Sequence, residues 1–311
     1  MAWAWAGAVA LVVASVVGGV ALASATVFSA SGFVRDYLTA LSADRIDEVL
    51  ALPGALDEGT DSALLTTHVG ERFAFEILGE EQSEGVHLVR VAFGAHPDRL
   101  GSRTTLAIEQ VGTRFLLFPR WGFAAPPLTT VSVELSGDAR FTVGERPVTS
   151  DASTIELTVL RPGIYRLDHE SDFLEARDVH VLAARRSESA SLSIRPTERF
   201  RDAVDGALDE LLDGCADQTV LFPVGCPFGT AVADRVISEP TWSIATVPSV
   251  TIEPADELGL WRVARFAGTA HLEVEVQDLY DGSRAIEERE VPFEAAYDVS
   301  FDSERVLLLP R

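Results

Sequence analysis

The chain has 311 residues, 47% of them hydrophobic, and a formal net charge of -23 at pH 7. At roughly 150 residues per domain this length predicts two domains, or three small ones. The negative charge argues against nucleic acid and anionic lipid headgroups as partners, because like charges repel. The sequence contains no lysine, so its basic side chains are arginine and protonated histidine, and no asparagine that could accept an N-linked glycan.

Residues 1–30 form an apolar segment that carries no charged side chain. The segment exceeds the roughly 20 residues that a membrane-spanning helix needs, and Trp3 and Trp5 lie at one end, where interfacial aromatic residues are common. We therefore expect a transmembrane helix. A cleaved signal peptide is the alternative, because Ala23-Ser24-Ala25 resembles a cleavage site. The absence of basic residues before the helix suggests the further hypothesis that the native chain starts upstream.

Residues 31–52 have the apolar spacing of two short helices. The apolar face of the first helix consists of Phe33, Val34, Tyr37, Leu38 and Leu41. We expect Ser42 to cap the second helix and Pro53-Gly54 to end it.

Strand patterns follow in residues 85–94 and 103–118. In the first of these, four alternating side chains share one face: His87, Val89, Val91 and Phe93. Gly112-Thr113 predicts a tight turn within the second. Helices followed by an antiparallel meander predict an α+β domain over residues 31–125, and Pro126-Pro127 predicts a linker after it.

Residues 128–195 consist of short strand patterns separated by Gly, Pro, Ser and Asp, which predict a small all-β, sandwich-like domain. Within it, Pro162-Gly163 is typical of the centre of a type II turn, with Gly163 at a positive φ.

The C-terminal segment, residues 197–311, predicts a second α+β domain. Residues 197–213 form the clearest helical pattern, with Thr197 as the N-cap and Gly214 just beyond the end. Long strand patterns follow, and Asp281-Gly282 predicts a hairpin between two of them. A helix followed by an antiparallel meander therefore occurs twice, which suggests a structural repeat. The expected fold class is α+β and rich in β-structure.

Cys215 and Cys226 are the only cysteines, with ten residues between them. Zinc would need more ligands nearby, and a thioredoxin-type redox pair needs the C-x-x-C spacing, so we expect neither a metal nor a cofactor. A disulfide closing this loop contributes about 3 kcal/mol on the chain-entropy model. Two free buried thiols are the alternative. Because disulfides persist in oxidising compartments, the pair places the body outside the cytoplasm, whereas Arg35 just after the apolar segment weakly favours the opposite orientation.

The order of these parts resembles a known family. The quoted stretches are FVRDYLTALSADRIDEVLAL, RFLLFPRWG, VGERPV, LRPGIYRL and CADQTVLFPVGCPFG. Together they are similar to membrane-anchored envelope proteins of the teicoplanin-resistance-associated (TcaA-like) type and their actinobacterial relatives. The resemblance implies extracytoplasmic domains after one transmembrane helix and an NTF2-like fold for residues 31–125. It brings no catalytic residues with it.

NTF2-like folds often enclose a cone-shaped pocket, and the resemblance makes Tyr37, His68 and His87 candidate pocket residues. No catalytic or metal-binding motif accompanies them. We therefore expect a single-pass, non-enzymatic binding, scaffolding or sensing protein of the bacterial cell envelope, with a cell-wall component or an envelope protein as its partner. An NTF2-like small-molecule binder or enzyme at the membrane surface is the alternative, and a cleaved, secreted protein is a third reading.

Overall fold

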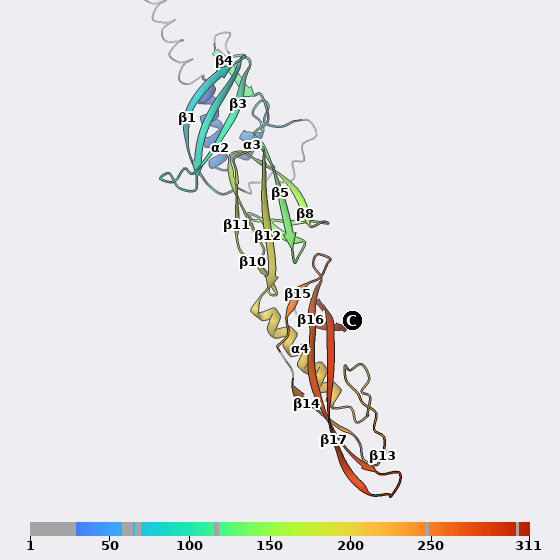
Figure 1. The fold of residues 1–311 in the computed structure, drawn as a ribbon. Coiled ribbons are helices and arrows are strands. Elements are labelled where there is room, and N and C mark those ends of the chain that lie inside the picture. Colours follow the sequence, from blue (N-terminus) through green and yellow to red (C-terminus); the bar gives the residue numbers. More distant parts are fainter. Residues whose placement is uncertain (1–28, 58–64, 66–69, 115–117, 247–248, 303–304) are drawn as a thin grey trace, which may run out of the picture.

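The computed structural model describes residues 29–57, 65, 70–114, 118–246, 249–302 and 305–311. Figure 1 shows an elongated body in which three β-rich units follow one another along the chain. Nearly all of the predicted transmembrane segment, residues 1–30, lies outside the described residues. Among the helices that are described, none combines the length and apolar character that crossing a membrane requires.

The first unit contains two helices packed on a four-stranded sheet. Its elements are α2 (Ala30–Ser42), α3 (Ile46–Leu50), β1 (Ala74–Ser83), β2 (Val86–Gly94), β3 (Ser102–Arg114) and β4 (Phe118–Phe123). The strands are antiparallel in the order β1-β2-β3-β4. The predicted helix pair is confirmed, and the apolar face of α2 meets the predicted face of β2, since Val34, Leu38 and Val89 are fully buried in one core.

Two local predictions in this unit are wrong. Ser42 does not cap α3: its hydroxyl donates to the carbonyl oxygen of Thr39 within α2, and Arg45 occupies the N-cap without a capping hydrogen bond from its side chain. Gly112 does not make a turn, because β3 continues through it to Arg114 and the pairing with β4 shifts register between Gln110 and Gly112. A bulge thus uses the glycine that the sequence pattern assigned to a turn.

The second unit contains two four-stranded sheets. Its strands are β5 (Leu128–Ser136), β6 (Arg140–Val143), β7 (Arg146–Thr149), β8 (Thr154–Leu160), β9 (Gly163–Asp168), β10 (Leu174–Ala176), β11 (Val179–Ala183) and β12 (Ser187–Pro196). The sheet orders are β10-β12-β5-β8 and β11-β9-β6-β7, and β12 pairs with β5 in parallel. Buried side chains from both sheets, such as Val133 and Leu167, share one core.

The predicted type II turn at Pro162-Gly163 is wrong. The Arg161–Pro162 peptide bond is cis, and Gly163 opens strand β9 without a positive φ. A Cβ at Gly163 would lie 2.6 Å from the ring of Tyr165. Close approach of this ring, rather than a left-handed backbone, therefore explains the glycine.

The third unit contains one helix and a six-stranded sheet. Its elements are α4 (Glu198–Ala216), β13 (Arg235–Val236), β14 (Thr241–Thr246), β15 (Ile252–Pro254), β16 (Trp261–Gln277), β17 (Arg284–Phe301) and β18 (Val306–Pro310). The hairpin predicted at Asp281-Gly282 is confirmed, because it joins β16 to β17. One edge of β16 pairs in turn with β15, β14 and β13, so this sheet does not repeat the simple meander of the first unit.

The end of α4 differs from the prediction, although its start does not. Thr197 is the N-cap, and its hydroxyl accepts a hydrogen bond from the backbone N–H of Phe200 at 3.2 Å. The helix runs past Gly214 to Ala216, so Gly214 does not end it and Cys215 lies inside its last turn.

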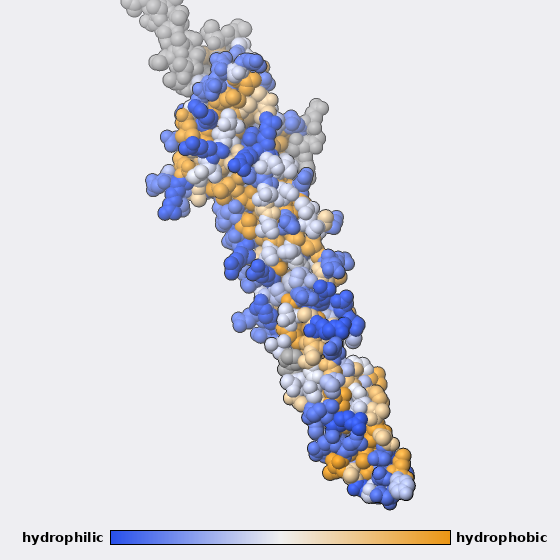
Figure 2. Space-filling view, viewed as in Figure 1, coloured by the Kyte–Doolittle hydropathy of each residue, from blue (hydrophilic) through white to orange (hydrophobic). Residues whose placement is uncertain are grey.

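Consecutive units along the chain pack directly on one another. Tyr37 of the first unit donates its hydroxyl hydrogen bond to the carbonyl oxygen of Arg161 in the second at 2.7 Å. Strand β12 leads almost directly into α4, where Phe200 packs 5.2 Å from Phe173 and 4.7 Å from Phe301, measured between ring centroids. The second and third units therefore share one continuous apolar core. Figure 2 shows strongly hydrophilic side chains over the visible face of all three units, with hydrophobic ones between them.

Candidate functional site

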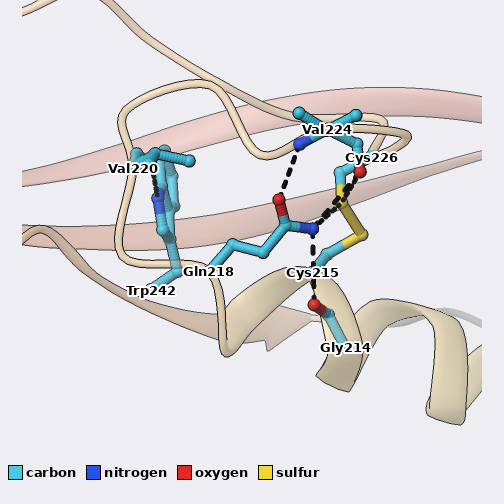
Figure 3. Close-up of a disulfide and its surroundings, with 7 residues drawn as sticks. All are labelled: Gly214, Cys215, Gln218, Val220, Val224, Cys226 and Trp242. Atoms are coloured by element: carbon cyan, nitrogen blue, oxygen red, sulfur yellow. Dashed lines mark hydrogen bonds between the residues drawn. A yellow bond between two sulfur atoms is a disulfide. The ribbon is translucent and has the colours of Figure 1, made fainter.

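The disulfide predicted between Cys215 and Cys226 is present, with the two Cα atoms 5.7 Å apart. Cys215 is buried in the last turn of α4, and Cys226 lies in the loop that follows. The bond ties this loop back to the end of the helix, as Figure 3 shows. Within the described parts of the chain, no group of three or more His, Cys, Asp or Glu side chains could hold a metal ion.

Gln218 is the hydrogen-bonding centre of this loop (Figure 3). Its side-chain oxygen accepts from the backbone N–H of Val224 at 2.8 Å, and its nitrogen donates to the carbonyl oxygen of Val224 at 3.2 Å. Trp242 of β14 adds a hydrogen bond from its indole N–H to the carbonyl oxygen of Val220 at 2.8 Å. The loop therefore has a defined shape that depends on one cross-link and a few polar contacts.

The two phenylalanines of the loop have different environments. Phe228 is 5% exposed and packs 5.1 Å from Trp242 and 5.5 Å from Phe293, measured between ring centroids. Phe222 is 62% exposed and Val224 is 84% exposed. Phe228 therefore anchors the loop on the sheet, whereas the other two side chains face solvent.

Tyr37, the first predicted pocket residue, is fully buried at the junction of the first and second units. Its ring lies edge-on to Phe123, 5.0 Å away, and its hydroxyl is occupied by the hydrogen bond to Arg161. Burial raises the pKa of the Tyr37 phenol well above its ordinary value. These contacts indicate that Tyr37 has a structural role at the junction of the two units.

His87, the second predicted pocket residue, lies at the other end of α2. Its Nδ1 is 2.6 Å from a carboxylate oxygen of Glu80, and its ring packs against Trp121 at 4.7 Å between centroids. Glu80 also accepts hydrogen bonds from the N–H of Ser31 at 3.1 Å and its hydroxyl at 2.5 Å. Burial alone would raise the pKa of Glu80, but the hydrogen bonds from Ser31 and His87 outweigh it, and the net shift is downward.

The structure does not bring the predicted pocket residues together. Ser31 lies at the start of α2 and bonds to Glu80, the partner of His87. Tyr37 lies six residues further along the helix, or about 9 Å of axial rise. His68 lies outside the described residues. The face of α2 that meets the sheet is filled by apolar side chains, and these include Val34, Leu38 and Leu41.

The sequence did not reveal a groove that lies between the first and second units. Its volume is about 480 Å³. It is lined by Leu78, Arg90, Arg103, Thr104, Thr105, Arg161, Ala184, Arg185 and Arg186. Three come from β3, one each from β1 and β2, and the rest from the links between β8 and β9 and between β11 and β12. The adjacent pair Arg185-Arg186 was the only local signal, and no pattern relates it to the other three arginines.

A second cleft, of about 860 Å³, lies between the second and third units. Its lining includes both acidic and basic side chains. Each of its three arginines forms an ion pair with a carboxylate: Arg140 with Asp138 at 2.9 Å, Arg262 with Glu253 at 2.9 Å and Arg311 with Asp298 at 3.4 Å. Its positive charges are therefore already compensated within the protein.

Comparisons of the chain with protein-family models, with curated proteins and with solved structures found no match.

Proposed function

We propose that the chain is a single-pass, membrane-anchored protein of the bacterial cell envelope, with its body outside the cytoplasm. The Cys215–Cys226 disulfide carries this proposal. Disulfides of this structural kind form and persist in oxidising compartments and are rare in the cytosol. The apolar segment of residues 1–30 supplies the membrane anchor.

The proposed role of the body is to bind or scaffold, with a cell-wall component or another envelope protein as partner, rather than to catalyse. The contacts of the two described pocket residues support this role. Tyr37 of α2 is hydrogen-bonded to Arg161, and His87 contacts Glu80, which itself holds Ser31 of α2. The apolar packing between α2 and the sheet counts against the alternative, an NTF2-like small-molecule binder or enzyme that uses that space.

Two finer assignments belong to the same proposal. The first unit is NTF2-like, which is supported by its helix pair followed by a four-stranded antiparallel sheet. The chain as a whole is a TcaA-like envelope protein, which is supported by its sequence of an apolar segment and several β-rich units.

The location is tested by fractionating native cells and mapping peptides without reduction. We expect the full chain in the membrane fraction, a linked Cys215–Cys226 peptide, and cleavage of the body by protease added outside spheroplasts. A matched variant that lacks residues 1–30 should leave the membrane fraction. Recovery of the native chain from the cytosol with both thiols free would refute the proposal.

The binding role is tested by crosslinking native membranes and recovering the chain with its neighbours. We expect envelope proteins or cell-wall material to be enriched over a control membrane protein with a single apolar helix. Turnover of a small molecule by the purified chain, lost when His87 is changed to Gln, would favour the enzymatic alternative instead.

A further inference from the structure

Five arginines line the groove between the first and second units. None of the five guanidinium groups forms an ion pair with a carboxylate of the described residues. The protein has 48 acidic residues against 25 basic ones, so carboxylates are abundant elsewhere on its surface. The five arginines therefore form a local concentration of positive charge that the acidic surface of the protein does not neutralise.

Two buried side chains in the groove have polar atoms without a partner. Arg161 is only 7% exposed, and its Nε has no hydrogen-bond acceptor among the described residues. Thr104 is 5% exposed, and its hydroxyl oxygen also has no hydrogen-bond partner in the part of the chain that the structure describes. Buried polar groups are almost always hydrogen-bonded in folded proteins, so unpartnered ones in a groove indicate a missing ligand.

The main chain of Arg161 is fixed by two hydrogen bonds. Its backbone N–H donates to the carbonyl oxygen of Pro127 at 2.7 Å, and its own carbonyl oxygen accepts the hydrogen bond from Tyr37. Burial lowers the pKa of its guanidinium, and the nearby charge of Arg186 lowers it further. The groove is thus a prearranged positive site in which like charges repel one another until an anion enters.

We propose that this groove binds an anionic ligand that carries two or more phosphate groups. The planar guanidinium presents donors in a fork that matches phosphate oxygens, and arginines converge here from β2, β3 and two inter-strand links. One phosphate ester carries about two negative charges, so two phosphates are needed to approach the charge of five arginines. The volume of about 480 Å³ suits a ligand of that size.

The second cleft also has a buried donor without a hydrogen-bond partner among the described residues, the indole N–H of Trp261, but it differs from the groove in charge. All three arginines of that cleft have carboxylate partners within the protein. The groove is formed by residues of the body alone, so anion binding there is independent of where the body lies in the cell.

The test is isothermal titration of the purified full chain in a non-ionic detergent. The probes are phosphate, pyrophosphate, tripolyphosphate and, as a carboxylate comparison, citrate. We expect affinity to rise from phosphate to pyrophosphate and tripolyphosphate, to exceed that for citrate, and to fall with added salt. Citrate binding as tightly as tripolyphosphate, or no binding of tripolyphosphate at millimolar concentration, would overturn the proposal.

Variants locate the binding. Arg185→Gln with Arg186→Gln, and separately Arg90→Gln, remove exposed groove arginines from different elements, and each should weaken tripolyphosphate binding at least tenfold. The matched control is Arg201→Gln with Arg284→Gln, which removes two exposed arginines outside the groove. An equal loss in this control would show attraction by net charge alone and would refute the site.

Free and lipid-linked sources of the phosphates are separated by one further pair of probes. Pyrophosphate and farnesyl diphosphate are titrated into the same detergent solution. Tighter binding of farnesyl diphosphate, lost in the Arg185→Gln/Arg186→Gln variant, would assign the groove to a lipid-linked diphosphate. Equal binding of the two probes would assign it to a soluble one, and both results support the site.

Discussion

Removing the cross-link between Cys215 and Cys226 should lower the stability of the third unit by a predictable amount. The two cysteines are 11 positions apart in the sequence. Closing a loop of that length restricts the unfolded chain by about 9 cal/mol/K, which is about 3 kcal/mol at 25 °C. Cys215 is 3% exposed, so its replacement also removes packing from the core. The Cys215→Ala/Cys226→Ala variant should therefore lose somewhat more than 3 kcal/mol.

Reduced wild-type protein is the matched control, because it keeps both sulfur atoms and loses only the bond. Gln218 and Trp242 still hold the reduced loop through their hydrogen bonds to it. The difference between reduced protein and the alanine pair then isolates the packing of Cys215, and the difference between oxidised and reduced protein isolates the cross-link.

Hydrogen exchange read by mass spectrometry in increasing urea is the appropriate assay, because one global unfolding curve would mix the three units. Peptides from α4 and β14 should report the loss, and peptides from β1 and β2 should not, since the first unit has a separate core. A loss below about 1 kcal/mol on reduction, or an equal loss in the first unit, would refute the reasoning.

Three further predictions concern single side chains. Thr197→Ala should cost about 1 kcal/mol in unfolding free energy, because the cap of α4 is lost, whereas Thr197→Ser should be nearly neutral; equal losses would contradict the capping role. Gly54→Ala should cost more than about 1 kcal/mol, because Gly54 has a φ of +74 and a Cβ would lie 2.3 Å from the carbonyl oxygen of Phe123; urea midpoints of the two forms check this. Tyr37→Phe should cost about 1–2 kcal/mol, because the carbonyl oxygen of Arg161 loses its partner. The folded-state pKa of Tyr37 is raised, so the contribution of its phenol to the unfolding free energy is complete below the unfolded pKa of about 10 and is lost as pH rises above that value. Between about pH 9.5 and 11, Tyr37→Phe should therefore lose less stability than wild type. Identical alkaline stability profiles of the two proteins would contradict this.

The parts of the fold that the sequence predicted correctly are those with short-range signals. The apolar period of α2, the alternation of Val89, Val91 and Phe93, and the cap at Thr197 each depend on neighbours within a few residues. The hairpin at Asp281-Gly282 is of the same kind. The disulfide could also be anticipated, because only one pairing of two cysteines exists.

The failures cluster at glycines, because glycine meets several different structural needs. Gly112 accommodates a register shift, Gly163 leaves room for the ring of Tyr165, and Gly214 lies within the last two turns of α4. The same residue type therefore has a different structural role at each of the three positions. Only the tertiary neighbours decide whether a glycine marks a turn, a bulge or a close contact.

The arginine groove had no comparable signal. Its arginines come from β2, β3 and two links more than 50 residues further along, as the numbers from Arg90 to Arg186 show. The junction that creates it also explains its rigidity. Arg161 holds Tyr37 of the first unit through its carbonyl oxygen and presents its guanidinium to the groove, so one residue belongs to both the packing and the site. A ligand that binds only when the two units are packed must stabilise that packing in return, by about 2.7 kcal/mol at a hundredfold excess over its Kd. The first two units are therefore expected to respond to the anion as one body.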